Sequence, residues 1–179
     1  MAENRVLLYV DEASFYLLPQ LGITWAKRGH SPVLREGCRY QHLSAISAIS
    51  PAGDLVYQIQ ESSFKGKDVV GFLKKLLDTL KQKLLIIWDG ARIHSSKEVK
   101  DFLRKDKNET IYLAKIPPYS PELNADEQVW KTLKCDMLKN VVCKNLAQLK
   151  TKLQDAFQVL QQATKKIANF FKHPKVGFV

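Results

Sequence analysis

The chain has 179 residues, with 28 Lys and Arg against 18 Asp and Glu, so its formal net charge is +10 at pH 7. This length favours a single domain with a full core. No apolar run is long enough to cross a membrane, and the first residues do not form a signal peptide. The three scattered cysteines fit neither a disulfide framework nor a zinc site, so we expect a cytoplasmic protein. The positive charge favours nucleic acid as a partner.

The first half of the chain predicts three strands and a helix. Residues 5–10 are strongly apolar and predict the first strand, whereas residues 13–41 are expected to be irregular, with part of them forming a hairpin or an excursion toward the substrate. Residues 42–50 and 54–60 alternate between apolar and polar and are joined by a turn signal, so they predict a hairpin. Apolar residues at helical spacing predict a helix over 67–81.

The second half alternates between strands and helices. The expected elements are a strand over 84–88, a helix capped by Ser95 or Ser96 that runs to about Arg104, a strand over 110–115, a helix around 124–139 and one long amphipathic helix over 146–171. The resulting order, β-β-β-α-β-α-β-α-α, predicts an α/β domain in which helices flank a mixed sheet of five strands. The whole chain, residues 1–179, is expected to form this one domain.

Acidic residues lie at the ends of three of these elements. Asp11 follows the first strand, Asp89 follows the fourth, and Asp126 and Glu127 lie at the start of the helix around 124–139. Ligands of open α/β sheets gather beyond the carboxyl ends of the strands, so Asp11 and Asp89 lie side by side if their strands are parallel neighbours. Carboxylates are the ligands that Mg²⁺ prefers, and an acidic cluster in a basic protein suggests metal-assisted phosphoryl transfer on nucleic acid.

Each acid also has an ordinary structural explanation. A single Asp after a strand is commonly a turn or cap residue, and acids in the first turn of a helix are stabilised by its dipole. Spacing does not decide whether Asp126 or Glu127 faces a site, because apolar residues follow each of the two acids at helical spacing.

Polar and basic residues near these acids are candidate supporting groups. Arg92 and His94 place donors close to Asp89, although a lone His is more often structural, and Asn124 is expected to cap the helix that follows it. The candidates for DNA phosphate contacts, which would position DNA without reading its sequence, are Lys27, Arg28, Arg35 and Arg39, together with lysines of the last helix.

Three segments together, YVDEASF, WDGARIH and PPYSPELNADEQVWKTLK, resemble the catalytic half of the mariner-like transposases, in the bacterial insertion-sequence branch. The resemblance covers about residues 5–165 and implies a ribonuclease H-like fold. It assigns the three acids of these DDE enzymes to Asp11, Asp89 and Glu127, and not to Glu12 or Asp126. It implies metal-dependent DNA strand cleavage and strand transfer in cut-and-paste transposition, with two Mg²⁺ or Mn²⁺ ions held by the three acids and Asp11 bridging both.

The resemblance also implies partners and a location. The implied partners are DNA, both the element ends and the target, and a second copy of the chain in a homodimer. The implied location is the bacterial nucleoid. Full-length relatives carry N-terminal helix-turn-helix modules, whereas here the first strand begins within ten residues of Met1. We therefore expect that the helix-turn-helix region is encoded in an upstream overlapping frame and joined to this chain by frameshifting, or that the chain is a fragment. Two alternatives stay open: a ribonuclease H-like nuclease, and a domesticated or inactive relative that only binds nucleic acid.

Overall fold

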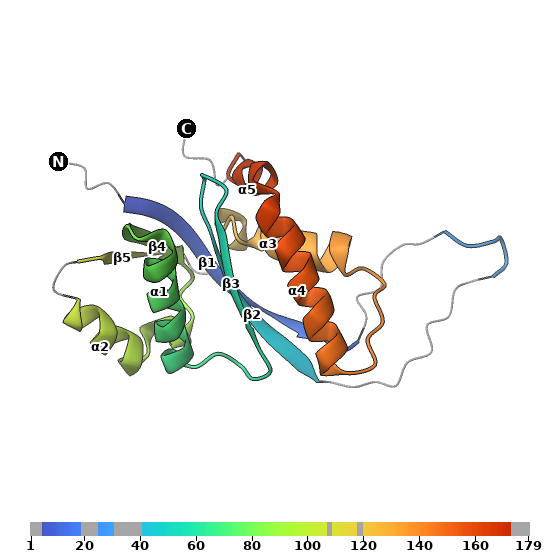
Figure 1. Ribbon diagram of the computed structural model, residues 1–179, viewed down its shortest axis with the longest axis horizontal. Coiled ribbons are helices and arrows are strands. Elements are labelled where there is room, and N and C mark those ends of the chain that lie inside the picture. The colour runs from blue at the N-terminus through green and yellow to red at the C-terminus, as the bar shows by residue number, and fades with distance from the viewer. Residues whose placement is uncertain (1–4, 19–24, 31–40, 107–108, 118–119, 173–179) are drawn as a thin grey trace.

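A mixed sheet of five strands lies at the centre of the fold (Figure 1). The computed structural model describes residues 5–18, 25–30, 41–106, 109–117 and 120–172. The strands are β1 (Arg5–Tyr16), β2 (His42–Ile49), β3 (Leu55–Gln60), β4 (Lys83–Trp88) and β5 (Ile111–Lys115), and their spatial order is β3-β2-β1-β4-β5. The strand β1 pairs antiparallel with β2 and parallel with β4, and β4 pairs parallel with β5. The predicted α/β fold with a mixed five-stranded sheet is confirmed.

Helices cover both faces of the sheet. The α-helices are α1 (Gly66–Leu80), α2 (Lys97–Lys105), α3 (Glu127–Lys131), α4 (Leu146–Gln162) and α5 (Thr164–Phe170). Two short 3₁₀ turns, η1 (Arg92–Ser95) and η2 (Pro121–Leu123), and a π-helical stretch, η3 (Thr132–Met137), complete the list. Figure 1 shows α1 and α2 on one side of the sheet and α3, α4 and α5 on the other.

The alternation of β1 divides its side chains between two cores. Tyr9 and Phe15 pack with α3, α4 and α5, whereas Leu8 and Val10 pack with α1 and α2. The apolar stripe of α4 lies in the first of these cores, where Phe157 is fully buried and stacks on Tyr57 of β3 at 4.1 Å. The apolar stripe of α4 therefore closes this core.

The strand β1 is longer than predicted. Its antiparallel pairing with β2 continues from Tyr9 opposite Ile49 to Tyr16 opposite His42, so residues 13–16 are strand and not irregular. Of the remaining expected excursion, residues 25–30 form an exposed turn, and residues 19–24 and 31–40 lie outside the described residues. The expectation of a hairpin there stays a prediction.

The predicted long C-terminal helix is interrupted at Ala163, and this prediction was wrong in that respect. The turn between β2 and β3 packs against the break: a Cβ built on Gly53 would lie 2.5 Å from the carbonyl oxygen of Thr164. The side chain of Gln161 also donates a hydrogen bond to the carbonyl of Leu55 at 2.7 Å. The chain therefore bends where the hairpin meets it.

The helix expected around 124–139 begins later than predicted. Asp126 occupies the N-cap position of α3, and not Asn124, which ends the preceding turn η2. The Asn124 Oδ1 still accepts a hydrogen bond from the backbone N–H of Asp126 at 3.1 Å. Asn124 therefore fixes the entry to α3 from two residues upstream.

Candidate active site

Asp11 and Asp89 lie at the same level of two adjacent parallel strands. The parallel register joins Tyr9 of β1 to Ile87 of β4, and two further residues along each strand lead to Asp11 and Asp89. Asp11 lies inside β1 and not after it as predicted, because β2 continues to pair with β1 there and places Ser47 opposite Asp11. The expected neighbourhood of the two acids is nevertheless found.

Glu127 joins them from the start of α3. Asp11, Asp89 and Glu127 line one pocket, which we call the acidic pocket. Its other lining residues come from the turn after β4, the loop after β5 and η2: Gly90, Ala91, Ile116, Pro117, Ser120, Pro121 and Asn124. Three segments that are far apart in the sequence therefore contribute one carboxylate each.

The carboxylate of Asp11 is held on both oxygens. Its Oδ1 accepts from the backbone N–H of Glu12 at 2.9 Å, and its Oδ2 accepts from the indole N–H of Trp130 at 3.1 Å. Burial raises the pKa of Asp11 from its ordinary 3.8 to about 7, and the charges of Glu127 and Glu12 act in the same direction. The hydrogen bonds oppose this shift without cancelling it.

The pKa of Glu127 is also raised. Burial is the main cause, the positive charge of Lys134 opposes it, and the negative charge of Asp89 adds to it. Acids that repel one another in a partly buried pocket gain from a bound cation, so the electrostatics of the pocket favour a positively charged ligand.

Asp126 occupies a different environment from its neighbour Glu127. Its side chain is fully buried and does not line the acidic pocket. Ser47 donates a hydrogen bond to its Oδ2 at 2.7 Å, and its Oδ1 has no hydrogen-bond partner among the described residues. Burial, and next the charge of Asp11, raises the pKa of Asp126 well above its ordinary value. The two adjacent acids are thus separated into a pocket-lining carboxylate and a buried carboxyl group.

His94 lies between two acids. Its Nε2 is 2.8 Å from the Oε1 of Glu12, its Nδ1 is 3.0 Å from the Oδ1 of Asp89, and its ring is buried and stacked on Trp88. Burial alone would lower the pKa of His94, but the hydrogen bond and charge of Glu12 and the charge of Asp89 raise it above its ordinary value. The predicted supporting position of His94 is therefore found, whereas the involvement of Glu12 was missed.

Of the remaining predicted residues, the three that the structure describes do not line the acidic pocket. Arg92 is exposed on η1 and does not line the pocket. Lys27 and Arg28 are exposed in a segment that Figure 1 draws apart from the sheet and its helices. Arg35 and Arg39 lie outside the described residues. Their contacts with DNA stay predictions.

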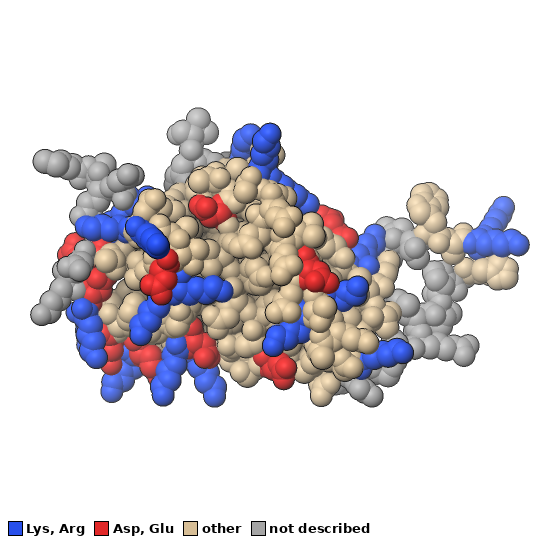
Figure 2. All heavy atoms as spheres, in the orientation of Figure 1, with Lys and Arg blue, Asp and Glu red and all other residues tan. Residues whose placement is uncertain are grey.

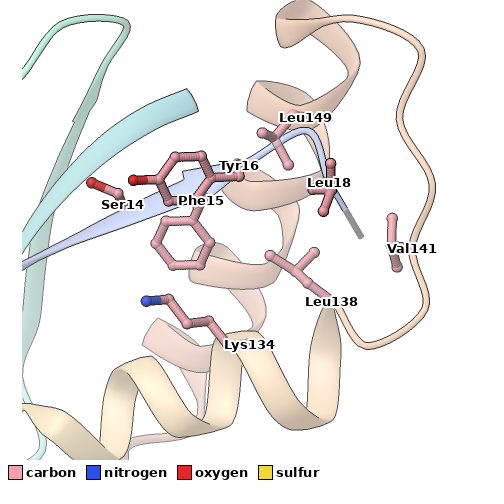
Figure 3. Close-up of a pocket in the computed structure, with 8 residues that line it drawn as sticks. All are labelled: Ser14, Phe15, Tyr16, Leu18, Lys134, Leu138, Val141 and Leu149. Atoms are coloured by element: carbon pink, nitrogen blue, oxygen red, sulfur yellow. The ribbon is translucent and has the colours of Figure 1, made fainter. Parts of the chain in front are cut away.

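A second pocket lies on the α3 and α4 side of the sheet (Figure 3). Its lining is mostly apolar and consists of Ser14, Phe15, Tyr16, Leu18, Lys134, Leu138, Val141 and Leu149. The Nζ of Lys134 lies 5.2 Å from the centre of the Phe15 ring. None of its lining residues is shared with the acidic pocket.

The donor chemistry of the acidic pocket fits Mg²⁺ or Mn²⁺, since all three acids offer hard oxygen ligands. Over the ranges that the structure describes, however, no group of three or more acidic, His or Cys side chains is gathered closely enough to hold a metal ion. The ligands are therefore present in one pocket but not drawn together around a common point.

The sheet order, the parallel central pair of strands, and the acids within β1 and directly after β4 match a ribonuclease H-like fold. Solved structures show the same fold. The catalytic domain of the Mos1 mariner transposase is 12 % identical with a TM-score of 0.63, over 94 % of this chain and 79 % of that one. The Mos1 mariner paired end complex with Mn is 13 % identical with a TM-score of 0.68, over 94 % and 54 %. A simian T-cell lymphotropic virus intasome is 13 % identical with a TM-score of 0.59, over 87 % and 48 %.

The sequence assigns the family. The model of the DDE superfamily endonucleases matches residues 6–150, so the chain belongs to this family. It is also 29 % identical over 157 residues to the insertion element IS630 uncharacterized 39 kDa protein of Shigella sonnei. That match covers 86 % of this chain and 44 % of the relative, so the chain spans less than half the length of that protein.

These matches confirm the predicted family resemblance and the predicted enzyme class. In the part of the chain that the structure describes, no helix is both long enough and apolar enough to span a bilayer.

Proposed function

We propose that this chain is the catalytic domain of a transposase that cleaves DNA strands and transfers them to a target. The observation that carries the proposal is the acidic pocket, in which a DDE-family chain brings together Asp11, Asp89 and Glu127. Support comes from the insertion-element relative and from the Mos1 structures, which include a strand transfer complex. The activity of the whole protein belongs to the proposal, because the relative is more than twice as long as the matched region.

Two divalent ions are part of the proposal, and Asp11, Asp89 and Glu127 would hold them. Mos1 paired end complexes have been solved with Mn and with Mg. When bound, such ions activate a water or a DNA 3′-hydroxyl as nucleophile and stabilise the leaving oxygen.

The protein's own residues orient the ligands. Trp130 holds one oxygen of Asp11, and His94 holds one oxygen of Asp89. Asn124 fixes the start of α3, and therefore the point from which Glu127 enters the pocket. The fold thereby supplies positioning, which is the main contribution of a protein to phosphoryl transfer.

The partners of the proposed enzyme are the ends of a mobile element, a target DNA, a helix-turn-helix segment from an upstream overlapping frame, and a second copy of the chain. We propose that the enzyme acts at the bacterial nucleoid, where these DNA partners lie. The basic charge of the chain supports contact with DNA phosphates.

Alanine substitution of the three acids tests the function. We expect Asp11→Ala, Asp89→Ala and Glu127→Ala each to abolish Mg²⁺- or Mn²⁺-dependent cleavage of element-end DNA by the enzyme completed with its helix-turn-helix segment. Glu122→Ala, at an exposed acid five positions before Glu127, is the control and should cleave as the wild type does. Near wild-type cleavage by any of the three variants would refute the assignment.

The same preparation separates the transposase from a ribonuclease H-like nuclease. A transposase joins pre-cut element ends to a target duplex, whereas a nuclease only cuts. Products of strand joining on a gel, absent in Asp89→Ala, are the expected result.

A further inference from the structure

We propose that Glu12 is a positioning residue, which acts through His94 to fix the carboxylate of Asp89 at the acidic pocket. The inference rests on the proposed function, because it gives Glu12 a purpose only if Asp89 holds a metal ion. It adds a fourth acid to the site, one that contacts His94 and is not itself a metal ligand.

The contacts form an unbroken chain from β1 to Asp89. The Oε1 of Glu12 lies 2.8 Å from the Nε2 of His94, and the Nδ1 of His94 lies 3.0 Å from the Oδ1 of Asp89. The backbone carbonyl of Asp89 is 3.4 Å from the same Nδ1. Both ring nitrogens therefore have acceptors, and Glu12 sets which way the ring faces.

Packing leaves the His94 ring little freedom. The ring is stacked on Trp88 with centroids 4.2 Å apart and planes 2° from parallel, and its side chain is fully buried. A half-turn of the ring about its Cβ–Cγ bond returns it to the same plane, so stacking alone does not distinguish the two orientations. The hydrogen bond to Glu12 does, since a flipped ring would place a carbon against the carboxylate.

Asp89 is the most exposed of the three acids that line the pocket, so its carboxylate gains most from such support. Its side chain is 51 % exposed, whereas Asp11 and Glu127 are partly buried. The backbone N–H of Ala91 donates to Asp89 Oδ1 at 2.9 Å, and His94 contacts the same oxygen. Neither contact uses Oδ2, so the two donors fix the carboxylate by one oxygen and leave the other for a ligand.

The position of Glu12 argues against a direct role as a metal ligand. Adjacent strand residues point to opposite faces, so Asp11 faces Trp130 of α3 while Glu12 faces His94 of η1. Glu12 does not line the acidic pocket. Strand β1 thus carries Asp11 itself, and its Glu12 orients Asp89 through the imidazole of His94.

The test is a double-mutant cycle on metal affinity. Mn²⁺ dissociation constants of the full chain are measured by titration calorimetry for the wild type, Glu12→Ala, His94→Ala and the double variant. We expect Glu12→Ala to weaken Mn²⁺ binding by about tenfold, the lower end of the range for partners of metal ligands. The double variant should bind no more weakly than His94→Ala, because Glu12 acts through His94.

Controls separate positioning from folding and from surface charge. Glu61→Ala removes an exposed acid at the end of β3 and should leave Mn²⁺ affinity and cleavage unchanged. Melting temperatures in EDTA report whether each variant is folded. Should Glu12→Ala fail to fold, Glu12→Gln carries the test: it keeps an acceptor for His94 but loses the charge. We expect a loss of about threefold there, because charged acceptors form the stronger hydrogen bonds.

The outcomes are distinguishable from failure of the proposed function. Asp89→Ala with wild-type Mn²⁺ affinity would overturn the proposed function, and this inference with it. Loss of binding in Asp89→Ala, combined with wild-type affinity in Glu12→Ala or in Glu12→Gln, would overturn this inference alone. Additive losses in the double variant would also overturn it, since Glu12 would then act without His94.

Discussion

Asp126 and Glu127 show how two adjacent acids can have unrelated roles. Glu127 lines the acidic pocket, and Asp126 is buried against Ser47. We expect Glu127→Gln to reduce DNA cleavage by at least about a hundredfold, because positioning of reacting groups is worth that much. Asp126→Asn keeps an acceptor for Ser47 and should cleave nearly as the wild type does. Cleavage rates of the two variants under the same Mn²⁺ concentration make the comparison, and the reverse order of severity would mean that Asp126 is the metal ligand.

Asp126→Ala should affect stability more than chemistry. It leaves the Ser47 hydroxyl buried without its acceptor, which costs about 1–3 kcal/mol. Urea unfolding monitored by circular dichroism measures this loss. An unchanged midpoint would contradict the proposed burial of the pair.

The raised pKa of Asp11 predicts a pH-dependent stability. Its pKa is about 7 in the folded state and 3.8 ordinarily, so between about pH 4 and pH 7 the folded state binds more protons than the unfolded state. The free energy of unfolding must then fall as the pH rises through this window. The raised pKa values of Glu127 and His94 act in the same direction.

Melting temperatures in EDTA test this at pH 5 and pH 8. We expect a clear fall for the wild type and a smaller fall for Asp11→Asn, which has no titrating group at this position. Equal falls in the two proteins would show that Asp11 is not the source.

At the residue scale, the motifs predicted that Asp11, Asp89 and Glu127 lie together, and all three line the acidic pocket. Their role as metal ligands stays a prediction, and the contacts that hold them were not predicted. The contacts of Glu12 with His94 and of Asp11 with Trp130 depend on the register of β1 against β4 and on the placement of α3. Neither the register nor the placement can be deduced from local residue spacing.

Among the elements, the β2–β3 turn packs against the point where the C-terminal helix breaks. Gly53 has a φ of +96° and lies against Thr164, so a side chain there is both strained and obstructed. We expect Gly53→Ala to destabilise the fold by roughly 1–3 kcal/mol. Gly71→Ala is the matched control: Gly71 is exposed within α1 with open space around it, and alanine should stabilise the helix by up to about 1 kcal/mol. Denaturant unfolding of both variants gives the signs, and a stabilised Gly53→Ala would contradict the contact.

Element types were predicted well, and their ends less well. The apolar periodicity of α1 and α4 was sufficient to locate both helices. The extra length of β1 coincides with its pairing to β2, and the break at Ala163 lies where the β2–β3 turn contacts the chain. Both lie at tertiary contacts, which can override a local pattern.

For the whole molecule, the charge predicts weak DNA binding with a steep dependence on salt. On the face seen in Figure 2, Lys and Arg side chains are interleaved with acidic ones and not gathered into one patch. Neutralising Z phosphates gives a log–log salt slope of about −0.9Z, so four or five contacts would make binding fade between low and physiological salt.

Fluorescence anisotropy with a cognate element end and a scrambled duplex tests this prediction. We expect similar affinities for both. A preference of more than about tenfold for the element end, shown by this chain alone, would mean that a base-reading element lies within it, since a single good base contact already gives that ratio.

Divalent metal should stabilise the folded chain. A ligand that binds only the folded state adds RT ln(1 + [L]/Kd), about 2.7 kcal/mol at a hundredfold excess over Kd. The sign follows from relief of repulsion among carboxylates with raised pKa values. A higher melting temperature in Mn²⁺ than in EDTA is expected, and Asp11→Ala should remove most of the difference. Identical melting temperatures with and without Mn²⁺, also in the presence of duplex DNA, would count against the metal site.

The hydrogen bond between Asp11 and Trp130 joins residues that are 119 positions apart. During synthesis, β1 therefore leaves the ribosome long before the indole that holds its acid has been made, and before Glu127 exists. A nascent chain or a product that ends ahead of α3 cannot assemble the acidic pocket. The order of the elements thus postpones assembly of the acidic pocket, and with it the proposed cleavage of DNA, until most of the domain has been translated.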